Sequence, residues 1–387
     1  MSGEWGSDDE NGTGIPVLRT TNFSNEGIVN YNDIVTRIIT KKNIDEKYLR
    51  KGDIIIEKSG GSDKLPVGRV IYFDGNENTY LFNNFTGLLR VQNQEIWYPK
   101  YVFYSLFANY KRGGTRPFEN RTTGLHNLKT DDYVSRYEIA DINKKDQVSI
   151  CKKLDKLQGI IKLREQELQL LNDLIRARFV ELFGDPIVNS FGWDTTRVEN
   201  LVASCEAGWS GNGTQREKED GEIAVLKVSA ITKGYFIPGE CKVLDDQDTI
   251  KKYVSPQAGD LLFSRANTRE MVGATAVITQ DYPEHILPDK LWKIRFLDRA
   301  NVWYMKYVLS SESIRSIFSS VSTGTSGSMF NVSMDKFKSI RVPIPPIEYQ
   351  QQFATFVTEV DKSKVKVQKA LDETQKLFDS LMQQYFG

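Results

Sequence analysis

One short segment of the sequence groups the residue types that a metal-dependent nuclease needs. Such an enzyme holds Mg²⁺ between carboxylates near a lysine, and Asp53, Glu57 and Lys58 offer that set. On an extended strand, however, the two carboxylates point to one face about 13 Å apart. The segment is repeated near residue 260, where Ser264 stands in place of Glu57. A self-contained Mg-dependent nuclease is therefore an alternative hypothesis rather than the leading one.

Motifs of other catalytic classes are missing from the sequence. There is no Gly-x4-Gly-Lys-Ser/Thr phosphate loop and no Gly-x-Ser-x-Gly motif. The two histidines and three cysteines are not spaced as metal ligands are. The base-clamping motif Asn/Asp-Pro-Pro-Tyr/Phe of amino-methyltransferases has no match, since Pro345-Pro346-Ile347 lacks its acid, amide and aromatic. We predict a non-catalytic chain with no metal site and no cofactor of its own.

Composition limits the class of protein further. A length of 387 residues predicts two or three domains. The 51 basic residues are balanced by 51 acidic ones, so bulk charge does not favour nucleic-acid binding and any such binding depends on local clusters. No apolar run is long enough to span a membrane, and the first residues are polar. We expect a cytoplasmic protein with no membrane partner.

The chain repeats itself once, at an offset of just over 200 residues. Residues 97–102 and 303–308 differ only at their third position, and each segment begins with a tryptophan. Residues 52–55 (Gly-Asp-Ile-Ile) correspond to residues 259–262 (Gly-Asp-Leu-Leu). Short β-branched runs bounded by Gly, Asp and Asn, such as residues 53–57, 69–73 and 275–279, indicate strands. Two similar α+β domains are predicted, with an internal pseudo-two-fold repeat.

A heptad pattern follows each domain and predicts two long helices. Its apolar stripe is interrupted by Arg164 in the first helix and by Lys364 in the second. Two ordinary amphipathic helices, each packed on its own domain, are the simpler interpretation. Helices of roughly 35 residues are about three times the usual length, so we favour a mutual coiled coil about 50 Å long. The stripe consists of Leu154, Leu157, Ile161, Leu168, Leu171, Ile175 and Leu182, and of Val357, Val360, Val367, Leu371, Phe378 and Leu381.

The resulting division of the chain has four segments. They are a first domain at 1–147, a helix at 148–185, a second domain at 186–346 and a helix at 347–387.

Three segments carry a resemblance to a known family. They are the Gly-Asp-Ile-Ile-Ile-Glu-Lys-Ser-Gly-Gly run at 52–61 with its copy at 259–265, the Pro-rich run Arg-Val-Pro-Ile-Pro-Pro-Ile-Glu-Tyr-Gln-Gln at 341–351, and Ala-Arg-Phe-Val-Glu-Leu-Phe-Gly-Asp at 177–185. In this order and duplicated, the chain resembles the specificity subunits of type I restriction–modification enzymes across essentially its whole length.

The resemblance implies two target-recognition domains, each reading half of a split DNA sequence, joined by antiparallel helices. Such a chain does no chemistry. It recruits two methyltransferase subunits, which use S-adenosylmethionine, and two restriction subunits, which use ATP and Mg²⁺. The second repeat opens with residues 191–201, whereas the first begins directly at Ser2-Gly3-Glu4-Trp5. We therefore expect the first domain to lack its opening strand, as an N-terminal truncation would leave it.

Double-stranded DNA is read by polar side chains on exposed loops and held by basic ones. The most cationic loop is Lys111-Arg112-Gly113-Gly114-Thr115-Arg116. The loops that follow each Gly-Asp strand differ between the repeats, as different half-sites require. Solvated surface loops and random drift are the simpler alternatives, and a coiled-coil scaffold with two protein-binding heads is a third hypothesis for the whole chain. The predicted DNA contacts are Arg19, Asn22, Lys58, Ser59, Arg69, Lys111, Arg112, Arg116, Ser264, Arg265, Asn267 and Arg269.

Overall fold

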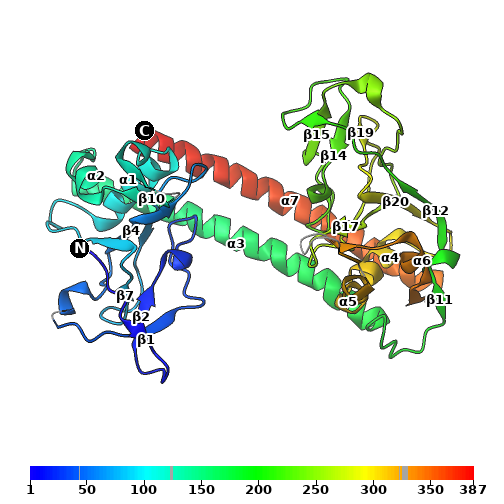
Figure 1. The fold of residues 1–387 in the computed structure, drawn as a ribbon, viewed down its shortest axis with the longest axis horizontal. Coiled ribbons are helices and arrows are strands. Elements are labelled where there is room, and N and C mark those ends of the chain that lie inside the picture. Colours follow the sequence, from blue (N-terminus) through cyan, green and yellow to red (C-terminus); the bar gives the residue numbers. More distant parts are fainter. Residues whose placement is uncertain (43, 123–124, 322, 325–329) are drawn as a thin grey trace. The chain divides into compact units, whose positions relative to one another are not determined.

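The computed structural model describes residues 1–42, 44–122, 125–321, 323–324 and 330–387. The chain forms two compact units (Figure 1). Unit 1 comprises Met1–Glu165 and Lys369–Gly387, and unit 2 comprises Gln166–Gln368. Each unit therefore contains one α+β domain and part of each long helix, so the compact units divide the helices that our four sequence segments kept whole.

Unit 1 contains three small sheets. The first sheet has the strand order β1 (Ser7–Asp8), β3 (Val35–Ile38), β2 (Ile15–Leu18), β7 (Leu81–Phe82). The second, central sheet has the order β6 (Val70–Tyr72), β4 (Ile54–Glu57), β8 (Thr86–Leu89). The third has the order β5 (Ser59–Gly61), β10 (Leu125–Leu128), β9 (Glu119–Thr122). Only the β2–β7 pair is parallel among these described strands. Alternate residues of β4 face two separate apolar clusters, with Ile55 in one and Ile54 and Ile56 in the other, because successive side chains of a strand point to opposite faces.

Unit 2 repeats this topology, with one extra strand, β12, at the edge of its central sheet. Its sheets have the order β13 (Gly213–Thr214), β15 (Cys241–Leu244), β14 (Ala224–Leu226), β19 (His285–Ile286); then β18 (Thr275–Val277), β16 (Leu261–Ser264), β20 (Leu291–Phe296), β12 (Val202–Ala207); and β17 (Ala266–Asn267), β22 (Phe330–Asn331), β21 (Thr323–Gly324). The β14–β19 pair is parallel, as its counterpart is in unit 1. The duplicated α+β fold predicted from the repeat is confirmed.

The two units differ at the outer edge of the central sheet. In unit 2, β12 pairs with β20 along its length, and a further two-stranded sheet joins β11 (Thr195–Arg197) to β23 (Arg341–Pro343). In unit 1, the equivalent edge of β8 is met by the first residues of the chain: Met1 and Leu88 exchange backbone hydrogen bonds of 2.8 Å, and Ser2 bridges to Gly87. The described residues of unit 1 form no counterpart of the β11–β23 sheet.

The shorter helices repeat only in part. Unit 1 contains α1 (Pro99–Lys111) and α2 (Thr130–Arg136), and unit 2 contains α4 (Val302–Ser310), α5 (Glu312–Val321) and α6 (Met334–Ser339). Helices α1 and α4 begin at the repeated Trp-Tyr-x-Lys-Tyr-Val segments.

The long helices are α3 (Lys144–Phe183) and α7 (Ile347–Phe386). Helix α7 begins where the sequence predicted, and α3 begins four residues earlier than the predicted residue 148. The side chain of Asn143 accepts a hydrogen bond from the Asp146 N–H at 3.0 Å. This is the geometry of an N-terminal cap, which satisfies an amide that the first turn leaves free.

A buried glutamine fixes the start of each long helix. The side chain of Gln147 accepts from the Tyr98 N–H (2.8 Å) and donates to the carbonyls of Ile96 (3.1 Å) and Ile142 (2.8 Å). Gln350, 203 positions later, accepts from the Asn301 N–H (2.9 Å) and donates to the carbonyls of Arg299 (3.1 Å) and Pro345 (2.7 Å). Both are fully buried. Each therefore ties a long helix to the first turn of α1 or α4.

The heptad stripes pack as predicted, and they also contact the domains. In unit 1, Leu154 of α3 shares a core with Phe378 and Met382 of α7 and with the aromatic side of α1. In unit 2, Ile175 of α3 shares a core with Val357 of α7 and with α4. Because the beginning of α3 meets the end of α7 in unit 1, and the reverse holds in unit 2, the helices pair antiparallel. The interpretation in which each helix packs only on its own domain is wrong.

Arg164 is the polar interruption of the first stripe. Its guanidinium donates to the carbonyl of Ala370 and to the hydroxyl of Thr374 on α7. A polar group that must find its partners at one place on the opposite helix fixes the register of the pair.

We predict that Leu154→Ala lowers the free energy of unfolding by about 2–5 kcal/mol, because it leaves a cavity in a fully buried position. Leu163→Ala is the matched control on the same helix; that leucine is 65% exposed and its loss should change stability by less than about 0.5 kcal/mol. Urea unfolding of the two variants measures both values. Equal effects would mean that the stripe does not carry the packing.

Candidate nucleic-acid interface

Asp53 and Glu57, the two carboxylates of the hypothetical metal site, interact with other residues of the fold. The carboxylate of Asp53 accepts from Nε and Nη2 of Arg90, both at 2.7 Å, and from the Arg50 N–H at 2.7 Å. Such a bidentate pair is among the stronger ion pairs in proteins. Asp260 repeats the arrangement with Arg295 Nε at 2.7 Å and the Gln257 N–H at 2.7 Å. The Gly-Asp motif is thus a turn that starts the central strand.

Glu57 is occupied as well. It is buried beside Arg69, at 3.6 Å from its guanidinium. Burial raises the pKa of Glu57, and the nearby arginine opposes that shift. Within the described residues, no group of three His, Cys, Asp or Glu side chains is placed to hold a metal ion.

Arg69, predicted as a DNA contact, instead supports the loop beside it. Its guanidinium donates to the carbonyls of Thr20 (2.9 Å) and Phe23 (3.0 Å) and lies over the Phe23 ring. Nearby, Lys58 donates to the Ser2 hydroxyl at 2.8 Å, and Ser59 begins β5. The Arg69 side chain therefore positions residues 20–23 instead of reaching outward.

The prediction for Asn22 is not supported by its position. This side chain is only 1% exposed. Its amide donates to the carbonyls of Asn30 (3.0 Å) and Asn32 (3.1 Å) and accepts from the Arg19 N–H (2.9 Å). The buried and hydrogen-bonded side chain of Asn22 is therefore not available to contact a DNA base. Arg19 itself remains partly exposed, with one nitrogen donating to the Asp33 carbonyl at 2.9 Å.

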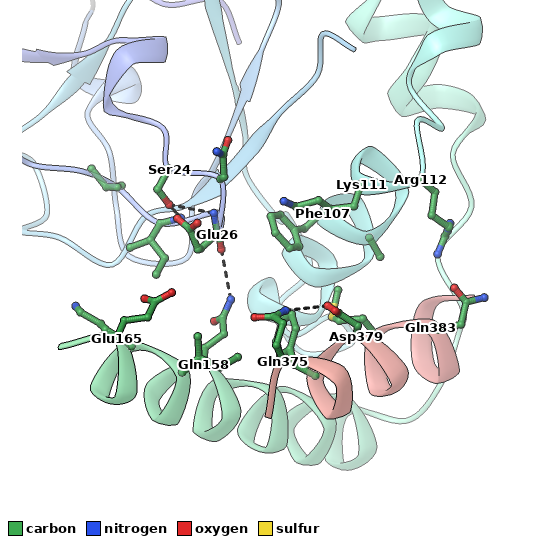
Figure 2. Close-up of a pocket in the computed structure, with 18 of the residues that line it drawn as sticks. Ser24, Glu26, Phe107, Lys111, Arg112, Gln158, Glu165, Gln375, Asp379 and Gln383 are labelled. Atoms are coloured by element: carbon green, nitrogen blue, oxygen red, sulfur yellow. Dashed lines mark hydrogen bonds between the residues drawn. The ribbon is translucent and has the colours of Figure 1, made fainter. Parts of the chain in front are cut away.

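In the cationic loop after α1, Lys111, Arg112 and Arg116 are exposed, whereas Thr115 is buried. Lys111 and Arg112 end α1 near the rim of a hollow of about 550 Å³ (Figure 2). Arg112 donates to the Phe386 carbonyl at 2.8 Å. Gly113 follows with a positive φ of 77°, which glycine adopts without strain and which turns the chain away from the helix. The Lys111 ammonium lies over the Phe107 ring, and both cations are exposed.

Arg116 brings two predicted contact segments together. It donates to the carbonyls of Asp63 and Lys64, both at 3.4 Å, in the loop that follows β5. Lys64 is exposed at the tip of that loop. Lys64 is not among the predicted contacts, although its place in the Gly-Gly-Ser-Asp-Lys turn between two strands was a signal for it.

In unit 2, the predicted contacts separate into buried and exposed residues. Ser264 is fully buried in β16, so its prediction as a base contact is not supported. Arg265 donates to the Asp289 carbonyl at 2.7 Å, and the Asn267 side chain accepts from the Thr268 N–H at 2.9 Å. Arg269 is exposed and lies over the Phe330 ring. Arg269 is the most accessible cation of this loop.

Fold and site together define a duplicated α+β recognition protein that presents exposed basic loops on two equivalent scaffolds. The chain belongs to the family described as type I restriction modification DNA specificity domain, whose model matches residues 4–173 and 192–374. This match confirms the resemblance, and the prediction of a non-catalytic specificity subunit agrees with it. None of the helices in the described ranges is long and apolar enough to cross a membrane.

Relatives agree with this placement. The EcoKI specificity subunit of Escherichia coli strain K12 is 23% identical over 404 residues, covering 96% of this chain and 82% of that protein. The EcoEI specificity subunit of Escherichia coli is 22% identical over 202 residues, covering 51% of this chain but only 34% of that protein. Among solved structures, the type I S subunit from M. genitalium has the same fold, with a TM-score of 0.53, 13% identity and coverage of 97% of this chain and 92% of that one.

We predict that replacing Arg112 and Arg116 together with alanine weakens DNA binding and reduces the salt dependence. Each lost phosphate contact should lower the slope of log K against log salt by about one, hence by about two for the pair. Arg136→Ala is the control, because Arg136 is an exposed cation of the same unit that is paired with Asp132. Titrations of a duplex at several salt concentrations measure the slopes. An unchanged slope in the double variant would remove this loop from the interface.

Proposed function

We propose that this chain is the sequence-reading subunit of a type I restriction–modification enzyme and recognises a bipartite DNA site, one half-site per unit, in the cytoplasm. The observation that carries the proposal is the repetition of three sheets whose shared strands have the same order, while the residues that follow the central strand differ. The same place after the central strand carries Lys58-Ser59-Gly60-Gly61 in one unit and Arg265-Ala266-Asn267-Thr268 in the other. Equal scaffolds with unequal loops suit two different half-sites.

The long helices support the split character of the site. Each has 40 residues, which corresponds to about 60 Å of uninterrupted helix. One turn of B-DNA is about 34–36 Å. We propose that these helices set the number of unread base pairs between the half-sites.

Recruitment of two methyltransferase subunits and two restriction subunits is the second part of the proposal. Leu174 on α3 and Leu377 on α7 occupy the same position of the repeat, 203 residues apart, and are 48% and 50% exposed. Exposed leucines at equivalent positions suit two copies of one partner. S-adenosylmethionine, ATP and Mg²⁺ would then belong to those partners and not to this chain.

The test of function is to co-express the chain with a type I methyltransferase subunit from the same genome and to map methylated adenines by single-molecule sequencing. A split motif with a fixed unread spacer is the expected result. A stable complex that methylates only continuous motifs would contradict the bipartite reading. Absence of both DNA affinity and a complex would favour a protein scaffold instead.

We predict that Leu174→Asp and Leu377→Asp each weaken capture of the methyltransferase subunit, and that the double variant abolishes it. Burying a new carboxylate in an apolar contact is strongly unfavourable. Lys152→Asp, at an exposed site on the first turns of α3, is the control for added negative charge. Size-exclusion chromatography of co-purified complexes measures the stoichiometry. Two bound subunits in the double variant would show that these leucines are not the contact.

A further inference from the structure

Unit 2 contains a hollow of about 1020 Å³, at the upper end of the size range of ligand sites. It is lined by α3, by α5 along its length, by Lys306 and Tyr307 of α4, by Lys364 of α7, and by residues 232–235, 269–270 and 274–275. Six cations line it, namely Arg176, Lys233, Arg269, Lys306, Arg315 and Lys364. Three acids, Asp185, Glu270 and Glu312, line it as well. The cations exceed the acids by three.

The equivalent hollow of unit 1 lacks this excess of charge. It is lined by three cations, Lys111, Arg112 and Lys162, and by three acids, Glu26, Glu165 and Asp379. The difference arises at equivalent positions of the repeat: Arg176 corresponds to Asp379, and Lys364 corresponds to Ile161. The positive charge is therefore a property of unit 2 and not of the shared scaffold.

Lys306 is the most informative of the six cations. Its repeat partner Lys100 forms an ion pair with Asp155 at 2.9 Å, but Thr358 occupies the position that corresponds to Asp155. Among the described residues, the contacts of the Lys306 ammonium are the rings of Trp303 and Tyr307, with no carboxylate in an ion pair. Burial lowers the pKa of Lys306 to about 8; Asp361 opposes the shift, while Lys364 and Arg176 add to it. A cation held this way is stabilised by any anion that enters.

A second, independent feature is the hydroxyl of Thr275. The residue is 1% exposed, lines the hollow, and its Oγ1 has no hydrogen-bond partner. Leaving a buried hydroxyl without a hydrogen-bond partner is unfavourable. The corresponding residue of unit 1 is Val70, so the fold at this position does not require a hydroxyl. Arg315, close by, donates to the carbonyls of Glu270 and Val272 but forms no ion pair among the described residues.

We propose that this hollow of unit 2 binds a small phosphate-bearing molecule, with Lys306 and Arg315 neutralising its charge and the Thr275 hydroxyl donating to one of its oxygens. Several cations and hydroxyl donors around one space suit an anion with three or more acceptor oxygens. A small anion can reach buried groups such as Thr275, whereas the backbone of a duplex lies along exposed surfaces. The inference goes beyond DNA recognition and does not depend on it.

The first experiment is isothermal titration of the full chain with pyrophosphate, ATP and citrate in a low-chloride buffer free of phosphate. One equivalent of pyrophosphate or ATP should bind, and citrate should bind more weakly. Lys306→Gln should weaken pyrophosphate binding by at least about tenfold, the loss expected for a charged hydrogen bond. Lys162→Gln, a cation of the hollow in unit 1, is the control and should leave the affinity unchanged.

The substitution Thr275→Val tests whether this threonine binds the anion or only packs within the fold. Removing the unpaired hydroxyl should raise the melting temperature of the free chain, yet weaken pyrophosphate binding about threefold to tenfold. A variant that is stabilised but binds as tightly as the wild type would overturn the role of Thr275. Absence of binding by the wild type, or tighter binding of citrate than of pyrophosphate, would overturn the phosphate site.

A DNA duplex added to the pyrophosphate complex separates two sources of the phosphate group. Displacement of pyrophosphate assigns the site to the DNA backbone, and retention assigns it to a small molecule. Because duplex affinity is measured in the same samples, a chain that binds DNA but no pyrophosphate overturns this inference while leaving the proposed function intact.

Discussion

The apolar stripe along the two 40-residue helices is the constraint on which the rest of the structure depends. A helix of this length with one apolar face is stable in water only when that face is covered. Leu154 and Phe378 are covered in unit 1, and Ile175 and Val357 in unit 2, each by the opposite helix and by the adjoining domain at once. Because the long helices and the adjoining domain share a hydrophobic core in each unit, each sheet domain is packed against the helices rather than merely linked to them.

The buried polar groups make that shared core specific. Gln147 and Gln350 each satisfy three backbone groups where a long helix begins, so the helix cannot rotate without leaving buried amides and carbonyls unpaired. Asp53 with Arg90, and Asp260 with Arg295, do the same for the turn before each central strand. These pairs explain why an aspartate stands at the same position of both repeats: it orients the backbone and an arginine rather than binding a metal.

The two units use one scaffold for different surfaces. The order of the shared strands and the helix-starting glutamines are the same in both, whereas the segment after the central strand differs in sequence and the hollow beside the helices differs in charge. Substitution at exposed positions costs little stability, so loops can diverge while the core does not. Arg176 against Asp379, and Thr275 against Val70, show this divergence extending from the loops to the walls of a hollow.

The sequence by itself determined the duplication, the α+β class, both long helices and the heptad stripe, because these depend on local periodicity and on matches between segments such as residues 97–102 and 303–308. It also suggested the exposed loop at Lys111 to Arg116, from composition alone. Tertiary structure decided which polar residues are free: Asn22 and Ser264 are buried, and Arg69 is turned inward onto the carbonyls of Thr20 and Phe23. The type of a residue tells which hydrogen bonds it can form, but the partners that satisfy it come from distant parts of the chain, and only the fold brings them together.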